Sequence, residues 1–249
     1  MLKRNMLLLF AFAAIAGSVN AQVRPGIKLG YNLSGVMADY LGDSSPEVLK
    51  ITAGDPGNFH MKSGFQAGFF ADCPISDAFT IQPGASFAMK GFSDSYRSGA
   101  PNGPKVTRNF SLYSVHVPVY VQYRLNVYEE TNVLFQAGPY ANFGLFGRQA
   151  INSSKTKFGS GDDKYKKITY GNGTKYDIQT VFDFGISAGV GIEYSRFQLV
   201  AAYDYGLSKS TFKKDAKSGK YNIDMRSHNF SVTLAYVFGR KDPLQNKKD

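Results

Sequence analysis

The sequence predicts an all-β fold, an eight-stranded antiparallel up-and-down transmembrane β-barrel. Three observations carry this prediction: an N-terminal export signal, eight stretches in which apolar and polar residues alternate, and connections that are short and long in turn. A chain of 249 residues suits one domain. Its mean hydropathy of −0.25 is too polar for a bundle of membrane helices. A membrane barrel tolerates this value because only alternate residues of each strand touch lipid.

The N-terminus has the three parts of a secretory signal peptide. Lys3 and Arg4 form a basic start, residues 6–16 are almost wholly apolar, and small residues precede a cleavage point between Ala21 and Gln22. The apolar run has about half of the roughly 20 residues that a spanning helix needs, so we expect it to be removed. The predicted division is a cleaved signal peptide over 1–21, the barrel over 22–239 and a charged tail over 240–249.

The charge balance excludes little by itself. The chain has 29 basic and 19 acidic residues. Removal of the signal peptide takes away Lys3 and Arg4 and leaves 27 basic residues against 19 acidic ones. A basic chain often binds nucleic acid, but an exported chain does not meet the genome, so no nucleic-acid partner is expected. The single Cys73 permits no internal disulfide, which fits a fold stabilised by closure of a barrel.

The first four alternating stretches are residues 26–34, 63–73, 79–91 and 109–125. Their apolar faces carry, in this order, Ile27, Leu29, Tyr31 and Leu33; Phe65, Ala67, Phe69 and Ala71; Phe79, Ile81, Phe87 and Met89; Tyr113, Val115, Val117, Val119, Val121 and Tyr123. A period of two places successive side chains on opposite faces of a strand.

The last four stretches are residues 133–146, 178–194, 197–208 and 228–238. The sixth has the most regular pattern, since every even residue from Ile178 to Tyr194 is apolar except Thr180. Each of the eight stretches reaches the roughly 9–11 residues with which a tilted strand crosses a bilayer, the shortest only just. No helical period of comparable length competes with this interpretation.

The connections fall into two classes. Three short turns are predicted at 74–78, 126–132 and 195–196, and four long loops at 35–62, 92–108, 147–177 and 209–227. Outer-membrane barrels have short periplasmic turns and long extracellular loops. The sequence therefore predicts four extracellular loops, three periplasmic turns, and both termini in the periplasm.

Three prolines fall inside the predicted strands. Pro83, Pro118 and Pro139 each lack a donor for the strand ladder. We expect them at bulges or bends, where a barrel needs curvature.

The polar face is predicted to line the lumen and the apolar face to meet lipid, the reverse of a soluble lipocalin-like barrel. Aromatic residues near both ends of the strands fit the girdles of a membrane barrel. The predicted lumen network contains charges of both signs: Lys28, Asp72, Lys90, His116, Arg124, Asp183, Glu193 and Asp204. An eight-stranded barrel is just wide enough for side chains to fill, so we expect a plugged lumen rather than an open pore.

Short motifs spread along the whole mature chain resemble the porin-family outer-membrane β-barrel proteins typical of Bacteroidota, which are related in architecture to OmpA-type and OmpX-type barrels. The motifs are Ile81-Gln82-Pro83-Gly84 running to Lys90-Gly91, Val115-His116-Val117-Pro118, Ala137-Gly138-Pro139-Tyr140, Phe184 through Gly189-Val190-Gly191-Ile192-Glu193, and Leu234-Ala235-Tyr236-Val237-Phe238. The resemblance implies an outer-membrane location in a Gram-negative cell. It does not imply channel activity.

Two positions depart from that family pattern. His116 stands where members often have an acidic residue, which changes the expected pairing in the lumen. Members also commonly end at the final aromatic residue, whereas this chain continues through a charged tail.

No catalytic, metal or cofactor site is expected. The three histidines, His60, His116 and His228, show no metal-ligand spacing. Ser114 and His116 share a face, but no third group that would orient them is evident, so a hydrogen bond in the lumen is the favoured role. Asp162 and Asp163 follow a glycine-serine run without a full calcium-loop pattern.

The long loops are the best functional candidates. The loop over 147–177 carries seven basic and three acidic residues, and that over 209–227 carries six and two. The residues proposed to contact anions are Lys164, Lys166, Lys167, Lys213 and Lys214. They are expected to meet lipopolysaccharide phosphates, host surfaces or partner proteins, or else to be merely solvated.

The leading hypothesis is a non-enzymatic, monomeric outer-membrane barrel with a structural or surface-interaction role. Its expected partners are outer-membrane lipid, lipopolysaccharide and the outer-membrane assembly machinery. Two alternatives stay open: a narrow channel for small solutes, and a lipid-modifying enzyme on the same fold.

Overall fold

The computed structural model describes residues 23–40, 59–97, 105–153, 165–168, 181–208, 210–216 and 219–239, and all its regular structure is β. The strands are β1 (Arg24–Tyr40), β2 (Phe59–Pro74), β3 (Phe79–Arg97), β4 (Lys105–Tyr128), β5 (Thr131–Ser153), β6 (Tyr165–Ile168), β7 (Phe182–Tyr194), β8 (Phe197–Gly206), β9 (Ser210–Ala216) and β10 (Gly219–Val237). Within these residues, no helix is long and apolar enough to cross a membrane.

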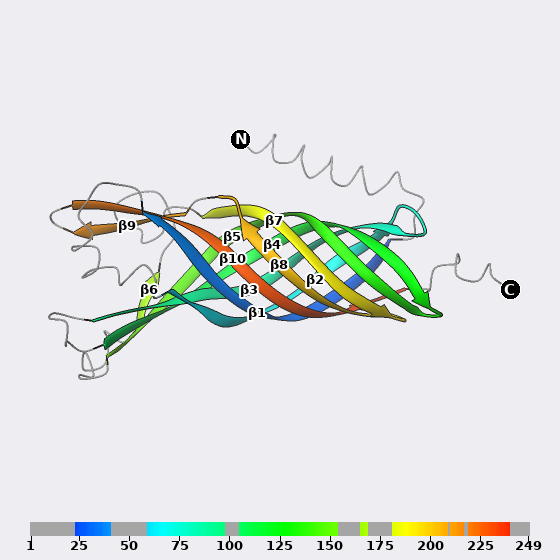
Figure 1. The fold of residues 1–249 in the computed structure, drawn as a ribbon, viewed down its shortest axis with the longest axis horizontal. Coiled ribbons are helices and arrows are strands. Elements are labelled where there is room, and N and C mark those ends of the chain that lie inside the picture. Colours follow the sequence, from blue (N-terminus) through cyan, green and yellow to red (C-terminus); the bar gives the residue numbers. More distant parts are fainter. Residues whose placement is uncertain are drawn as a thin grey trace.

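Eight strands close into a ring. They follow the order β1-β2-β3-β4-β5-β7-β8-β10, each antiparallel to the next, and β10 pairs back with β1 from Gly26↔Val237 to Tyr40↔Ile223. Figure 1 shows the first and last ring strands running side by side, oblique to the long axis. The predicted eight-stranded up-and-down barrel is confirmed, because the eight alternating stretches match these strands in order.

The short turns lie at one end of the barrel, which we call the turn end; the opposite end is the loop end. The turns cover residues 75–78, 129–130 and 195–196. Glu129 and Ser195 adopt positive φ angles of 31° and 55°, as tight reversals require. The middle turn is shorter than predicted, since β4 continues to Tyr128 and β5 begins at Thr131.

The predicted ends of the strands at the loop end are wrong. The β4–β5 ladder extends to Val106↔Ser153, and the short strands β6 and β9 add to β5 and β10 inside regions predicted as loops. Both short strands lie at the left-hand end of Figure 1. Apolar and polar residues need to alternate only where one face of the strand meets lipid. Strand pairing needs only backbone hydrogen bonds and can continue beyond the lipid. The alternating pattern therefore marks the lipid-covered part of each strand and not its full length. Loop residues 41–58, 98–104, 154–164 and 169–180 lie outside the described residues, and so do 178–180 of the predicted sixth strand.

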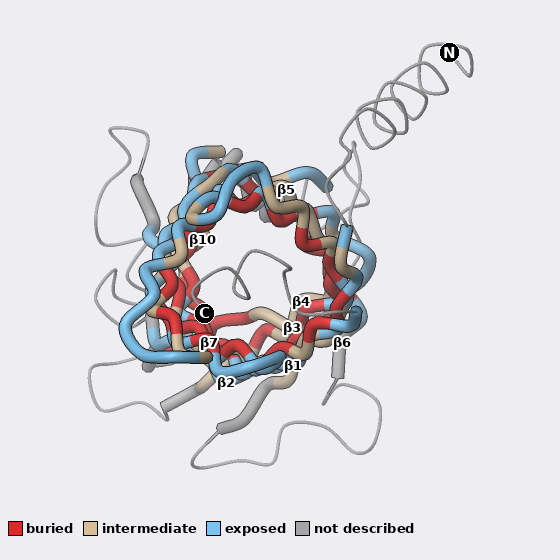
Figure 2. The backbone as a smooth tube through the Cα atoms, turned by 90° about the vertical axis from the view of Figure 1, so that its right-hand side faces the viewer, coloured by how far each residue is buried: buried red, intermediate tan, exposed pale blue. Residues whose placement is uncertain are grey.

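The two faces of the ring differ as predicted. Figure 2 views the barrel end-on, with buried positions turned inward and exposed positions outward. Leu29 and Phe69 on the outer face are 65% and 66% exposed, whereas Asn32 and Gln122 on the inner face are both 0% exposed. A soluble barrel buries its apolar face, so this arrangement belongs in lipid.

Bulges or bends were predicted at the three prolines, and the prediction of bulges is wrong. Register shifts occur between Met61 and Gln66, Tyr113 and Ser114, and Asn126 and Tyr128. Pro83, Pro118 and Pro139 keep the register opposite Val119, Tyr140 and Ile186, respectively. A strand residue directs its N–H to one neighbour only, so a proline removes one donor and leaves the rest of the ladder in register.

Aromatic side chains on the outer face mark the two edges of the lipid band. Near the turn end, Phe79, Tyr123 and Phe135 lie in a row with ring centroids 5.1 and 6.5 Å apart. Toward the loop end, a second row contains Phe65, Phe87, Tyr113 and Phe146, with centroids 6.5, 5.8 and 4.6 Å apart.

The spacing of the two rows fits a bilayer. Along β4, Tyr123 and Tyr113 are ten residues apart, or about 33 Å of strand and roughly 25 Å along the barrel axis at a typical tilt. This equals the usual height of the apolar band of an outer-membrane barrel. The part of β4 from Tyr113 back to Lys105 therefore stands beyond the lipid, about 20 Å above it by the same conversion.

Candidate functional site

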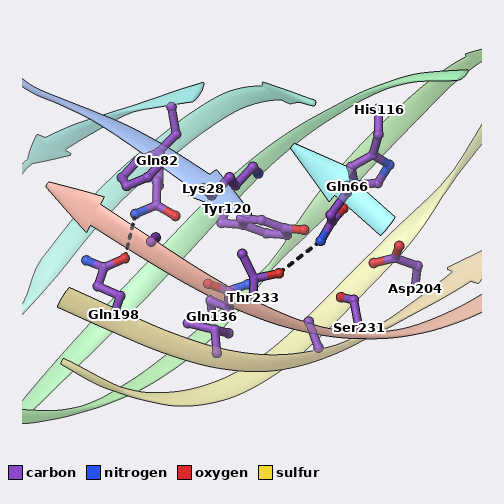
Figure 3. Close-up of a pocket in the computed structure, with 14 residues that line it drawn as sticks. Lys28, Gln66, Gln82, His116, Tyr120, Gln136, Gln198, Asp204, Ser231 and Thr233 are labelled. Carbon is purple, nitrogen blue, oxygen red and sulfur yellow. Dashed lines mark hydrogen bonds between the residues drawn. The ribbon is translucent and has the colours of Figure 1, made fainter. Parts of the chain in front are cut away.

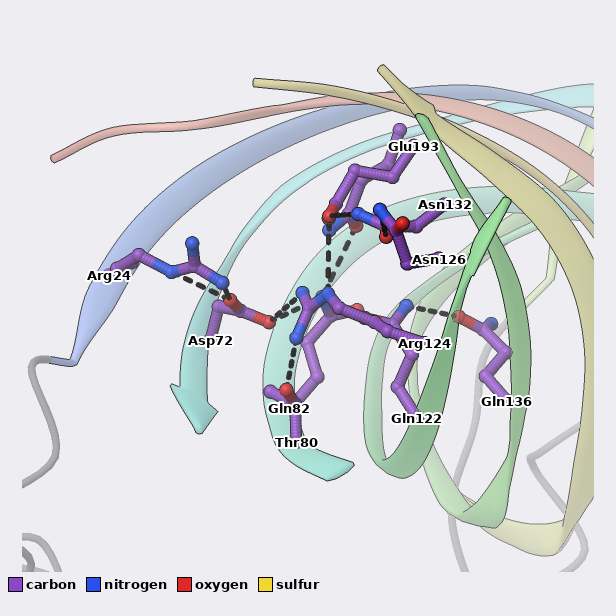
Figure 4. A network of polar contacts seen from close by, with 11 residues as sticks. Arg24, Asp72, Thr80, Gln82, Gln122, Arg124, Asn126, Asn132, Gln136 and Glu193 are labelled. Atoms are coloured by element: carbon purple, nitrogen blue, oxygen red, sulfur yellow. Dashed lines mark hydrogen bonds and ion pairs between the residues drawn. The ribbon is translucent and has the colours of Figure 1, made fainter. Parts of the chain in front are cut away.

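A chain of alternating charges crosses the lumen near the turn end (Figure 4). Asp72 on β2 is fully buried and accepts hydrogen bonds from Arg24 Nε at 3.0 Å and Arg124 at 2.9 Å. Arg124 on β4 also donates to Glu193 on β7 at 3.2 Å and to the Thr80 hydroxyl. In the ring, β3 separates β2 from β4, and β5 separates β4 from β7. The contacts among these three strands therefore pass through the interior. Both carboxylates of this cluster, Asp72 and Glu193, thus have an arginine partner, which offsets the cost of removing charge from water.

Neutral amides complete this turn-end cluster. Asn132 and Gln198 donate to the two oxygens of Glu193 at 2.9 and 2.7 Å. Gln82 in turn donates to Gln198 at 3.3 Å. Hydrogen-bonded side chains therefore lie across the lumen at this level.

Above this cluster lies a small cavity lined mainly by polar side chains (Figure 3). Its lining residues are Lys28, Gln66, Phe70, Gln82, His116, Tyr120, Gln136, Gln198, Val200, Ala202, Asp204, Ser231, Thr233 and Ala235. The space open to the centre of a water molecule is about 30 Å³, which is room for about two waters. Gln66 donates to Thr233 across it at 2.9 Å.

A third group of contacts lies toward the loop end. Lys90 on β3 pairs with Asp204 on β8 at 3.4 Å, and Asn229 donates to the same carboxylate at 3.0 Å. Asp183 accepts from Ser227 at 2.8 Å, from Asn142 at 3.2 Å and from the Ser208 hydroxyl.

His116 joins this group through Asn142. Its Nδ1 donates to the Asn142 Oδ1 at 2.8 Å, since that oxygen can only accept, and the ring is 3% exposed. The imidazole also packs on Tyr140 with centroids 5.1 Å apart. Ser114, its neighbour on the same face, makes no described contact with it, so these two side chains do not form a nucleophile and base pair. Within the described residues, no group of three or more His, Cys, Asp or Glu could hold a metal ion.

The structure places all eight residues of the predicted lumen network on ring strands facing the interior. It joins Asp72, Arg124 and Glu193 in one cluster and Lys90 with Asp204 in another. His116 reaches Asp183 through Asn142. Lys28 lines the cavity, and no ion pair of Lys28 is found among the described contacts.

Arg24 is the functional residue that sequence reasoning missed. It precedes the first alternating stretch, which begins at residue 26, whereas β1 begins at Arg24 itself. The alternation could have identified Arg24, because it lies four positions before Lys28 and every second residue of a strand points to the same face.

The remaining predicted residues fall outside the described residues or on the short strands β6 and β9. The cleavage position at Ala21 and Gln22, and Lys164, lie outside the described residues. Lys166 and Lys167 belong to β6, where Lys167 is exposed, and Lys213 and Lys214 belong to β9.

Comparison with known proteins gives the following matches. The family model for the outer membrane protein beta-barrel domain matches residues 12–211. No curated protein sequence matches the chain significantly.

Similar solved structures include the following three. Ail, the attachment invasion locus protein of Yersinia pestis, is 13% identical with a TM-score of 0.36, covering 87% of this chain and 99% of its own. Neisserial surface protein A is 14% identical with a TM-score of 0.39, covering 86% and 97%. OprG from Pseudomonas aeruginosa is 9% identical with a TM-score of 0.41, covering 88% and 95%.

Proposed function

Because this chain belongs to the family of outer membrane protein beta-barrel domains, we propose that it is a non-conducting barrel that acts at the cell surface. The chain is an integral outer-membrane protein; what we add is the closed lumen and the surface role. The observation that carries the proposal is the charge cluster around Asp72 and Arg124, which fills the interior near the turn end.

The strands that continue beyond the lipid support a role at the surface. The ladders of β4 with β5 and of β1 with β10 hold these extensions in a defined shape, and β6 and β9 widen them. We propose that the loop end is extracellular and the turn end periplasmic, as the loop lengths predict. With this orientation, residues 1–21 are a cleaved signal peptide, 22–239 the barrel and 240–249 a periplasmic tail.

The geometry favours a non-enzymatic role. His116 lies inside the lumen, and its Nδ1 is occupied by Asn142. A lipid-modifying enzyme needs its reacting groups at the bilayer or at the surface, where the described residues provide no such arrangement. The partners proposed are outer-leaflet lipid, including lipopolysaccharide, and the assembly machinery that inserts barrels, with the protein itself a monomer.

Conductance in planar bilayers tests the closed lumen. The mature protein, refolded and inserted, is expected to give no steady stepwise currents, because ion pairs and amides fill the path of a solute. Insertion is checked in the same preparation by protection of the barrel from protease. Persistent unitary currents from inserted protein would overturn the proposal and establish the narrow-channel alternative.

A further inference from the structure

A row of basic side chains lies directly above the loop-end aromatic row on the outer face. Arg148 follows Phe146 by two residues on β5, so both side chains point outward, roughly 7 Å apart along the strand. Lys167 on β6 is the cross-strand partner of Arg148. Both Arg148 and Lys167 are exposed.

Lys62 extends this basic row to β2. Its Nζ donates to the Ser111 hydroxyl at 2.6 Å, and Ser111 on β4 is the cross-strand partner of Arg148. The lysine side chain lies over Gly91 of β3 to reach it, since a Cβ at Gly91 would come within 3.1 Å of Lys62 Cδ. Three cations are thus gathered over β2 to β6, on one side of the barrel.

The placement of two cations opposite each other is informative. Arg148 and Lys167 face each other across the ladder, and like charges in that position repel. A phosphate group that contacts both side chains would interact with two cations at once. The level is also specific, because the cations stand just beyond the aromatic girdle, where the phosphates of membrane lipids lie.

We propose that Lys62, Arg148 and Lys167 bind the phosphorylated headgroup of an outer-leaflet glycolipid, lipopolysaccharide, whose acyl chains lie over Phe65, Phe87, Tyr113 and Phe146. A lipid fits better than a free anion because the apolar and basic parts of the surface are continuous. The aromatic row offers the acyl chains 38–49% exposed phenyl rings at Phe65, Phe87 and Phe146. The inference rests on the proposed orientation with the loop end outside, and not on the closed lumen.

Native mass spectrometry of the folded mature protein tests the lipid site, with diphosphorylated lipid A as the probe. Replacing any one of the three cations by glutamine removes one charge interaction with the headgroup and is expected to weaken binding about fivefold. The triple variant, with Lys62→Gln, Arg148→Gln and Lys167→Gln together, is expected to weaken binding about a hundredfold. Dephosphorylated lipid A is expected to bind the wild type as weakly as lipid A binds the triple variant. Inorganic phosphate is expected not to compete, which separates a lipid headgroup from a free anion.

Arg226→Gln supplies the matched control. Arg226 on β10 lies on the outer face of the other side of the barrel and donates to the Tyr205 hydroxyl at 3.3 Å. This variant removes the same charge and is expected to keep wild-type binding. Lys62→Arg is expected to restore the binding that Lys62→Gln loses. Equal losses in Arg226→Gln and the triple variant, or unchanged binding in the triple variant with its fold intact, would overturn the site.

Orientation is tested separately. A Lys167→Cys variant in a Cys73→Ser background is expected to react with an impermeant maleimide on intact cells. Labelling without lipid binding would reject this site alone. Absence of labelling on intact cells, with labelling after lysis, would reject the orientation and the site together.

Discussion

At the scale of single residues, Asp72 organises the turn-end cluster. It is fully buried and contacts arginines from two different strands, β1 and β4. A buried carboxylate is tolerated only when cations and hydrogen bonds replace its water, and Arg24 and Arg124 do so here. Arg124 in turn pairs with Glu193 on β7. The ion pairs around Asp72 therefore link four strands, β1, β2, β4 and β7.

Replacing Asp72 by asparagine is expected to destabilise the barrel strongly. Both arginines would lose their shared anion while staying in the lumen, at a cost of about 3 kcal/mol. The free energy of unfolding in urea, measured for refolded protein in detergent micelles, checks this. Thr233→Val is the control, since it removes only the neutral hydrogen bond from Gln66 and should cost about 1 kcal/mol. Equal losses in the two variants would mean that the ion pairs add nothing beyond a neutral contact.

The residue scale also shows what alternation does and does not reveal. Alternation alone assigned Asp72, Arg124 and Glu193 to one face of their strands. Which of these groups meet depends on the stagger of strands around the ring, which places residues far apart in sequence at one height. Asp72 and Arg124 are 52 positions apart in the sequence, and the stretch between them carries no pattern that encodes this meeting.

At the scale of elements, the barrel wall depends on close approach of strands at particular glycines. A Cβ on Gly138 of β5 would lie 2.0 Å from the Val119 carbonyl of β4, which is backbone and cannot give way. Gly84 on β3 is less restricted, with the nearest atom at 3.1 Å. Both glycines adjoin a mid-strand proline, so they form a matched pair.

Gly138→Ala is therefore expected to destabilise the barrel by about 2 kcal/mol, because β4 and β5 must separate to admit the methyl group. Gly84→Ala should cost about 1 kcal/mol or less, since the contact needs a shift of only a few tenths of an ångström. Urea unfolding of both variants in the same detergent checks the order. A larger loss at Gly84 would contradict the packing of this part of the wall.

The strand extensions explain why element boundaries were the weakest part of the sequence prediction. The turns at 195–196 and 75–78 were predicted well, since short reversals between alternating stretches leave little choice. At the loop end, the polar residues of β4 before Asn109 and of β5 after Phe146 do not alternate as lipid-facing strands do. They pair all the same, because two neighbouring strands already aligned by the membrane satisfy each other's backbone groups.

At the scale of the whole molecule, closure of β1 on β10 leaves no free edge in the ring. Every ring strand then has a neighbour on both sides, which is the condition for backbone to exist in lipid. The lumen contributes a second, polar set of contacts across the interior. These two sets of contacts reinforce each other, since the wall fixes the positions from which the lumen side chains meet.

Closure predicts that the refolded barrel resists sodium dodecyl sulfate without heating. Unheated protein is expected to migrate faster on a gel than boiled protein. Leu234→Arg should reduce the shifted fraction, because Leu234 faces lipid at the seam between Leu29 and Leu199, whereas Leu234→Ala should retain the shift. Identical migration of heated and unheated wild-type protein would contradict a closed ring.

The sequence by itself determined the strand number, the order of the strands, which face of each meets lipid and the short turns. These properties follow from local patterns: a period of two and turn residues between stretches. Only the tertiary structure decided the pairing of charges in the lumen, the continuation of strands beyond the bilayer, the in-register prolines and the basic row above Phe146. Each of these depends on the stagger between strands and on the partner that each backbone finds, and a single strand's sequence contains neither.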